Sequence, residues 1–399
     1  MTGIHELVPA PRLGGKTTFV LFVAVLLAFV AETQITQYLQ TTLQYRQSYF
    51  IFYIVHSCFS LSLPIHLVYL LATTELEVRP LLSGLRYAVM RQLSPVSGSF
   101  QDIHLRKFPI VKAVLIMGAL TVFYNMPGLL WFVAVPLASV TDVTAIWNAN
   151  AFFTYIFSVI LLGMDWGLLR LTAVCLATFG VMTIVYGGTT ASPLGPESMQ
   201  TSAVQVSSPF VGDMLTLIAS VGYALYQVIY KKYIALPTDP DLELPSESSH
   251  YRSLATAEDL VDEENSSPAL LKGSLVYPPP FGLHPNLVTT SIGVFTFLVL
   301  WIPIPILHYY RLEEFHLPTR PDVLIAIAGI TASGVMFNAG FMILLGAWGP
   351  IVTSVGSLLT IVLTLFSDLI FGTVALTLGG LIGTGMIVGA FAVLVYDML

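Results

Sequence analysis

Long apolar stretches recur along the whole chain, and they restrict its fold more than any other feature. One of them, TTFVLFVAVLLAFVA at 17–31, contains no charged residue. A helix that crosses a bilayer needs about 20 apolar residues. Only 10% of the 399 residues are charged, whereas soluble domains carry about 25%. The sequence therefore predicts an all-α integral membrane protein with ten transmembrane helices, at 17–38, 48–72, 109–134, 139–162, 168–188, 212–234, 287–309, 322–346, 349–372 and 375–396.

The distribution of Lys and Arg predicts the orientation of these helices. If the N-terminal segment 1–16 is cytosolic, thirteen basic residues face the cytosol, many of them in the loop 74–108. Only three lie on the other side, namely Arg46, Arg311 and Arg320. Cytoplasmic loops carry an excess of Lys and Arg. We therefore expect both termini to be cytosolic.

One long acidic loop, at 235–286, separates the helices into two sets of five. It holds nine acidic residues, several serines and the sequence YPPP. A segment of this composition buries too little apolar surface to order itself. We expect most of 238–275 to be disordered and cytosolic, as a linker or, alternatively, as a phosphorylation or partner-binding segment. The five-helix units are then 17–188 and 212–396.

The fourth and ninth helices resemble each other. VTAIWNANAFFTYIFSVILLG at 143–163 aligns with VTSVGSLLTIVLTLFSDLIFG at 352–372, with a constant offset of 209 residues. Because five is an odd number, the second unit enters the membrane from the opposite side. The sequence therefore predicts an inverted 5+5 repeat, an architecture typical of alternating-access carriers with a substrate site between the repeats.

Polar residues in these helices recur at steps of three and four, which places them on one helical face. We interpret these faces as the lining of a shared cavity. The alternative is that Ser and Thr bond their own backbone or join neighbouring helices. The candidates are Thr144, Asn148 and Tyr155 in the fourth helix, Thr353, Ser357, Thr360 and Thr364 in the ninth, and Asn125 and Asn338 in the helices that precede them.

Several segments resemble a known family. GDMLTLIASVGYALYQVIYKKY at 212–233 is similar to the start of an EamA-like repeat, and LLGMDWGLLRLTAVCLATFGVMTIVYGG at 161–188 resembles the end of the preceding repeat, with the usual acidic residue displaced to Asp165. The chain thus resembles the drug/metabolite transporter superfamily. AETQITQY at 31–38 and SYFIFYIVHSCFSLSLP at 48–64, with Tyr45 before them, look most like subfamily F of the solute carrier 35 transporters and fungal vacuolar-membrane relatives. Gln47-Ser48 replaces the usual Lys-Pro.

The resemblance implies a ten-helix secondary transporter in an endomembrane, vacuolar or Golgi. The partners it implies are a small-molecule substrate and the lipid bilayer, with a homodimer left open. We expect no cofactor, no nucleic acid and no enzymatic activity, because the histidines are scattered and no P-loop or HExxH motif occurs. Cys58 and Cys175 fall inside apolar runs and are expected to be buried, without a disulfide or metal.

Polar groups in three helices are further candidates for the substrate cavity. Glu32 and His56 each lie about eight residues from the predicted outer surface, which corresponds to roughly 12 Å. We hypothesise that they lie near each other and couple transport to protons. The alternative is that Glu32 reaches the interface and His56 forms a structural hydrogen bond. Tyr223 and Gln227 share a helical face with Tyr230 and could hold a planar ring.

The substrate class is constrained by the position of the basic residues. Almost all Lys and Arg lie at predicted membrane edges, which favours a neutral or cationic metabolite, with thiamine as one candidate implied by the family. A nucleotide-sugar antiporter and a non-transporting scaffold are the alternatives. Lys231 and Lys232 are interpreted as topology anchors, or alternatively as residues that attract a phosphate-bearing substrate.

Overall fold

The protein is an integral, multi-pass membrane protein built from helices. The computed structural model describes residues 15–74, 77–93, 108–134, 137–138, 140–187, 190–191, 209–236, 279–370, 374–375 and 377–398. Within these ranges, nine helical spans are long and apolar enough to cross a bilayer, or ten if α13 (Leu283–Val299) and α14 (Pro303–Tyr309), which meet at a bend of 42°, form one span. The predicted all-α membrane fold is confirmed at this level.

The helices follow the apolar stretches closely. The earlier part of the chain forms α1 (Gly15–Thr41), α2 (Ser48–Ser57), the short 3-10 helix η1 (Cys58–Leu61), α3 (Ser62–Thr73), α4 (Val78–Leu93), α6 (Ile110–Ala134), α7 (Val140–Asn148), α8 (Asn150–Leu162) and α9 (Leu168–Gly187). The later part forms α10 (Pro209–Tyr233), α13 and α14, α15 (Pro321–Trp348), α16 (Pro350–Ser357), α17 (Leu359–Ile370) and α18 (Leu378–Met398). Strand β1 (Thr190–Ala191) pairs antiparallel with β2 (Val374–Ala375).

Two predicted loop boundaries are wrong. The segment 74–108, expected to be only a basic loop, contains the helix α4, whose Leu81 and Leu85 are buried against α3 and α13. We predicted that the acidic loop extends to 286, but α13 already begins at Leu283. The polar residues in the first turn of α13 concealed this start in the apolar pattern. The expected disorder at 238–275 and the N-terminal segment 1–14 lie outside the described residues.

Hydrogen bonds between helix ends define two faces of the molecule. The face where α1 begins and α18 ends is called here the terminal face. Arg170, at the start of α9, bonds Asp397 at the end of α18, which places the preceding end of α8 on this face. Lys232 Nζ donates to Leu161 O at 2.5 Å, which adds the end of α10. On the opposite face, Tyr45 OH donates to His316 O at 2.9 Å, which joins the loop after α1 to the loop before α15. Burial and the charge of Glu313 raise the pKa of Tyr45 to about 12, so this phenol stays a donor at neutral pH.

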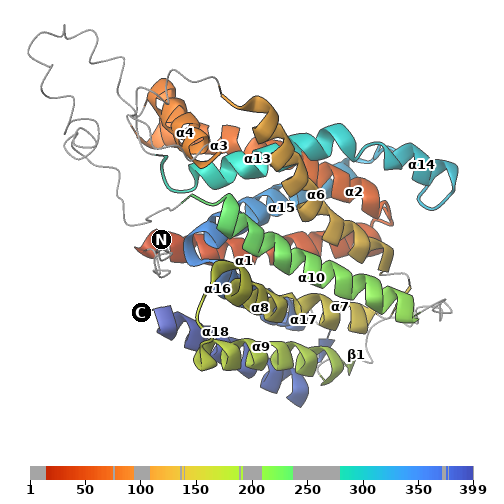
Figure 1. Ribbon diagram of the computed structural model, residues 1–399. Helices are drawn as coiled ribbons and strands as arrows, with labels where there is room; N and C mark the ends of the chain where they lie inside the picture. Colours follow the sequence, from red (N-terminus) through yellow and green to blue (C-terminus); the bar gives the residue numbers. More distant parts are fainter. Residues whose placement is uncertain are drawn as a thin grey trace, which may run out of the picture.

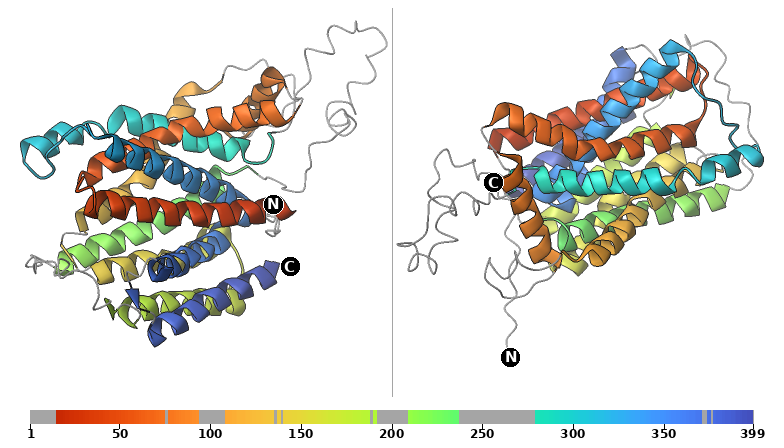
Figure 2. Two further views of the ribbon diagram at one scale, coloured as in Figure 1. Left: turned by 180° about the vertical axis from the view of Figure 1, so that it is seen from behind. Right: turned by 90° about the horizontal axis from the view of Figure 1, so that it is seen from above.

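The spans are stacked in layers between these faces (Figure 1). At one end of the stack, α13 packs against α2, η1 and α3. At the other end, α9 and α18 lie side by side, as the left-hand view in Figure 2 also shows. Between them, α10 packs against α6, α7 and α8, called here the first group, while α1 packs against α15 and α17, which with α16 form the second group.

Two spans carry a one-residue interruption near their middle, although each still runs as a single span. The first break, between α7 and α8, is at Ala149, and the second, between α16 and α17, is at Leu358. At each of these residues the backbone hydrogen bond spans three residues in place of four. Ala149 N donates to Ile146 O at 3.2 Å, and Leu358 N donates to Val355 O at 3.1 Å. The two breaks are separated by the offset of 209 residues that relates the two sequences.

Candidate functional site

A carboxylate lies in the middle of α1, against α15. A Cβ atom placed on Gly334 would lie 2.9 Å from Glu32 Oε1 and 2.6 Å from Val55 Cγ1, so the glycine leaves room for the acid. No basic side chain among the described residues forms an ion pair with Glu32. An ionised carboxylate at membrane depth is costly unless it faces the protein interior or water, and such groups mark substrate or proton pathways.

A hydrogen bond links the two groups of helices beside this carboxylate. Tyr124 OH on α6 donates to Asn338 Oδ1 on α15 at 2.5 Å. Asn338 Nδ2 in turn donates to Gly334 O at 2.8 Å, the residue on which Glu32 rests. Asn338 and Glu32 are therefore neighbours, although they are far apart in sequence. Sequence reasoning missed Tyr124, because a single tyrosine beside Asn125 gives no periodic signal.

His56 does not pair directly with Glu32. Its Nδ1 lies 2.9 Å from Phe52 O, one turn earlier in α2, and its ring stacks on Phe52 with centroids 3.8 Å apart. The two side chains are not within ion-pair distance. The two side chains thus form no ion pair, and the prediction that they lie near each other stays a prediction. His56 contacts the cluster through Tyr124, whose ring centroid is 5.9 Å away.

Aromatic rings from four spans form a continuous wall next to these polar groups. Trp147 on α7 stacks on Tyr223 at 5.3 Å and 29°, and Tyr223 lies 6.4 Å from Phe341. The series continues through Phe337 at 5.8 Å to Phe29 on α1 at 4.9 Å. Faces of aromatic rings attract cations and stack on planar groups. The predicted role of Tyr223 as a ring-stacking residue is compatible with this wall, and Trp147 is an addition that the sequence did not reveal.

A buried polar chain joins α10, α16 and α8 closer to the terminal face. Ser354 Oγ lies 2.6 Å from Gln227 Oε1, to which it donates, and 3.3 Å from Thr154 Oγ1. All three side chains have 0% exposure. The Nε2 atom of Gln227 has no hydrogen-bond partner in the described part of the chain. Buried polar groups with free donors are costly unless a ligand or water satisfies them. Gln227 was predicted, whereas Ser354 and Thr154 were not.

Most of the predicted polar stripe serves the two helix breaks. Asn148 Nδ2 donates to Thr144 O at 2.8 Å, and Ser357 Oγ and Thr360 Oγ1 donate to Ser354 O and Ser357 O at 2.7 and 2.6 Å. A broken helix frees carbonyl groups that lipid cannot satisfy. These side chains therefore follow the alternative interpretation, in which they bond their own backbone.

The ninth span also borders a small cavity. Thr353 and Ser357 line it, together with apolar side chains of α1 and α15, and its volume of about 10 Å³ is enough for roughly one water molecule. Thr353 Oγ1 itself donates to Gly349 O at 2.8 Å. Thr364 lies on α17, half-buried, and joins none of these groups.

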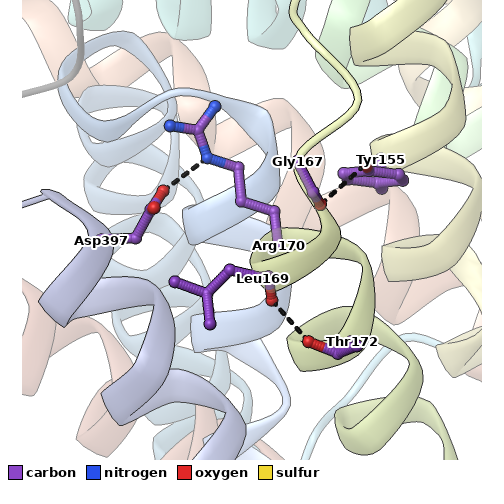
Figure 3. Close-up of polar contacts among 6 residues, drawn as sticks. All are labelled: Tyr155, Gly167, Leu169, Arg170, Thr172 and Asp397. Atoms are coloured by element: carbon purple, nitrogen blue, oxygen red, sulfur yellow. Dashed lines mark hydrogen bonds and ion pairs between the residues drawn. The ribbon is translucent and has the colours of Figure 1, made fainter.

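Two other predicted cavity residues lie outside the cluster. Tyr155 is fully buried in the core between α8, α9 and α18, and its OH donates to Gly167 O at 3.2 Å (Figure 3). Asn125 Nδ2 donates to Thr296 Oγ1 on α13 at 3.0 Å. Their positions on the expected helices were right, but each side chain faces a helix–helix contact.

Comparisons with known proteins reveal the fold alone. No family model matches the chain, and no curated protein matches it either. A solved structure, named only "Crystal structure of protein", is 13% identical, over 96% of this chain and 97% of that chain, with a TM-score of 0.56. The whole architecture, including the order of its spans, is therefore similar to one already found by experiment.

Proposed function

We propose that this chain is a secondary transporter that moves a small polar metabolite across a membrane by alternating access. The observation that carries the proposal is the cluster of Glu32, Tyr124 and Asn338, which lies at mid-depth where the first and second groups of helices meet. Intramembrane ionisable residues that face such an interface are features of substrate and proton pathways.

An inverted 5+5 repeat accounts for the helix packing. In such a repeat α1 corresponds to α10, and α6 corresponds to α15. Exchange of the two units therefore turns the α1–α15 contact into the α10–α6 contact, and both contacts are extensive. The same exchange relates α1–α17 to α10–α8, and α2–α15 to α13–α6. The pair α9–α18 exchanges with itself. Reciprocal packing of this kind is what a twofold relation in the membrane plane requires.

The fourth and ninth spans support the same reading. Each is interrupted at one residue, and Ala149 and Leu358 occupy equivalent places at the offset of 209 residues. A matching irregularity in the two units is what a structural repeat predicts. The sequence likeness to the drug/metabolite transporter superfamily and to subfamily F of the solute carrier 35 transporters agrees with this proposal, as does residence in a vacuolar or Golgi membrane.

The site favours a neutral or cationic substrate over a nucleotide sugar. It combines the Glu32 carboxylate, which lacks a basic partner among the described residues, with a wall of aromatic rings. An anionic diphosphate would be repelled by this carboxylate at short range. Lys231 and Lys232, the basic residues considered for phosphate attraction, donate instead to backbone carbonyl groups near the terminal face.

Counterflow in proteoliposomes tests the function. Vesicles are loaded with unlabelled thiamine, and the uptake of labelled thiamine is measured against a labelled nucleotide sugar in the same preparation. We expect saturable uptake of the cation that preloading accelerates. Counterflow of the nucleotide sugar alone would replace the assignment by the antiporter alternative, and absence of counterflow across a wider panel of metabolites would favour a scaffold.

Proton coupling through Glu32 is part of the proposal. We expect uptake to depend on an imposed pH gradient in the wild type and to lose this dependence in Glu32→Gln. The matched control is Glu314→Gln, which changes an exposed glutamate on the loop before α15. Uptake that is independent of pH in the wild type and persists in Glu32→Gln would exclude the proton mechanism.

A further inference from the structure

Three lysines at the terminal face donate to the carbonyl groups of helix ends. Lys232 Nζ donates to Leu161 O, in the last turn of α8, at 2.5 Å. Its neighbour Lys231 donates to Gly346 O, in the last turn of α15. Lys112, at the start of α6, donates to Leu93 O at the end of α4. Each ammonium group thus caps a helix other than its own.

Such contacts are favourable for two reasons. The last four carbonyl groups of a helix have no partner within the helix. They also carry the negative end of the helix dipole, which attracts a cation. A lysine that caps a neighbouring helix therefore joins the ends of two helices, and the junction persists only while the two ends stay close together.

Lys231, near the end of α10, links the two groups of helices. α10 packs mainly within the first group, but Lys231 crosses to α15 in the second group. Behind it, Tyr230 has 0% exposure, and its OH lies 3.8 Å from the position of a Cβ atom on Gly346. Phe22 and Trp348 belong to the same hydrophobic core as Tyr230, and their ring centroids lie 5.0 Å apart.

Two further contacts between the two groups lie in the same half of the molecule. Tyr226 OH on α10 lies 3.1 Å from Met342 Sδ, and Gln227 bonds Ser354, between the middle of the helices and the terminal face. By contrast, Trp147 and Tyr223 at mid-depth remain partly exposed. The described conformation is therefore packed shut toward the terminal face.

We propose that Lys231 forms a lock that holds the carrier closed at the terminal face. To open this face, the end of α10 must move away from α15, and Lys231 must release the Gly346 carbonyl group. Lys232 bonds α8 within the first group and need not release. The inference rests on the proposed function, because closure of one face has a role only in a carrier. It assigns Lys231 a conformational role, beyond the topology anchor expected from the sequence.

The test measures how fast a buried cysteine reacts, which requires no substrate. Ser158 on α8 has 0% exposure, its hydroxyl is unbonded within the described structure, and it lies one turn before Leu161. Ser158→Cys is introduced into a Cys58→Ala, Cys175→Ala background. The rate of labelling by a water-soluble maleimide is then compared between Lys231→Met and two matched controls, the adjacent Lys232→Met and Lys112→Met.

We expect Lys231→Met to label about tenfold faster, because a hydrogen bond to a charged group contributes about that factor to an equilibrium. Lys232→Met and Lys112→Met should label at the parent rate, since neither lysine joins the first group to the second. Lys231→Arg keeps a donor and should restore slow labelling. Equal rates in all variants, or an equal rise in either control, would refute the lock.

The outcome is separable from that of the transport assay. Counterflow in the parent chain with an unchanged labelling rate in the lysine variants would refute the lock and leave the carrier intact. A faster labelling rate without any counterflow would support a closed terminal face and count against transport. Monodisperse elution and an unchanged melting temperature of the single Met variants show that the comparison is made on folded protein.

Discussion

The α9–α18 pair and the cluster around Glu32 are built in opposite ways. In the pair, backbones approach closely through small residues, since a Cβ atom on Gly383 would lie 2.5 Å from Gly180 O and one on Gly379 would lie 2.3 Å from Gly187 O. In the cluster, large rings and polar side chains meet, and the Glu32 carboxylate has no basic partner in the described ranges. The pair is suited to a fixed scaffold and the cluster to a site that binds and releases.

The contrast shows where stability and function are separated in this fold. Tight contact between small residues is the usual means of joining helices in lipid, where no hydrophobic force acts between them. A polar cluster of the second kind costs stability, and proteins retain such sites where activity needs them. Mutations at the two places should therefore have different signatures.

The largest expected effect is at the α9–α18 contact. Gly383→Ala should lower the free energy of unfolding by about 1–3 kcal/mol, because the added methyl group meets backbone atoms that cannot move aside. Thermal unfolding in detergent measures the change. Gly385→Ala is the control, since a Cβ atom there meets no described atom within 4 Å. Equal destabilisation by both changes would show that this pair is not closely packed.

Glu32→Gln should act in the opposite direction on stability. We expect the free energy of unfolding to rise by about 1–2 kcal/mol, because a neutral amide costs less to bury than an ionised acid. Pairing this measurement with the uptake assay separates a functional acid from a structural one. A fall in the melting temperature would mean that the carboxylate holds the helices together.

Tyr124→Phe tests the bond between the two groups of helices. Loss of the hydroxyl removes the donor to Asn338 Oδ1 and should cost about 1 kcal/mol. Tyr53→Phe is the control, because the Tyr53 hydroxyl donates to Phe297 O from an exposed position at 3.2 Å. The two melting temperatures are compared directly, and a larger loss in Tyr53→Phe would reverse the assignment.

The smallest effect is expected at the terminal face of the scaffold pair. Arg170 Nε lies 2.5 Å from Asp397 Oδ2, as Figure 3 shows, and both side chains are partly exposed. Ion pairs of this kind contribute about 0–1 kcal/mol and weaken with salt. A double-mutant cycle with Arg170→Gln and Asp397→Asn, at low and high salt, should give a coupling energy in that range. A larger, salt-insensitive value would make this contact part of the scaffold core.

The spans were predictable because apolar length is a one-dimensional signal. The predicted helix at 168–188 matches α9 (Leu168–Gly187), and that at 322–346 lies within α15 (Pro321–Trp348). The helix α4 was missed because its basic residues resemble those of a cytosolic loop, although its leucines are buried. The two helix breaks lie at the offset of 209 residues that the sequence alone reveals, but neither break was predicted, because no proline or glycine marks it.

The site was only partly predictable, because helical phase does not say which neighbour a face meets. Gln227 and Asn338 were identified and do join the two groups of helices. Tyr155 has the expected phase, but its face meets α9. Tyr124 could be recognised only once α6 and α15 were brought together in three dimensions.

Ala149 and Leu358 interrupt the regular hydrogen-bond pattern of two spans that otherwise each run as one helix. Asn148 and Ser357 donate to carbonyl groups beside these residues, so the backbone stays satisfied there. Polar backbone groups in lipid must find their partners within the protein. An irregular turn supported in this way can flex slightly without exposing its carbonyl groups to lipid.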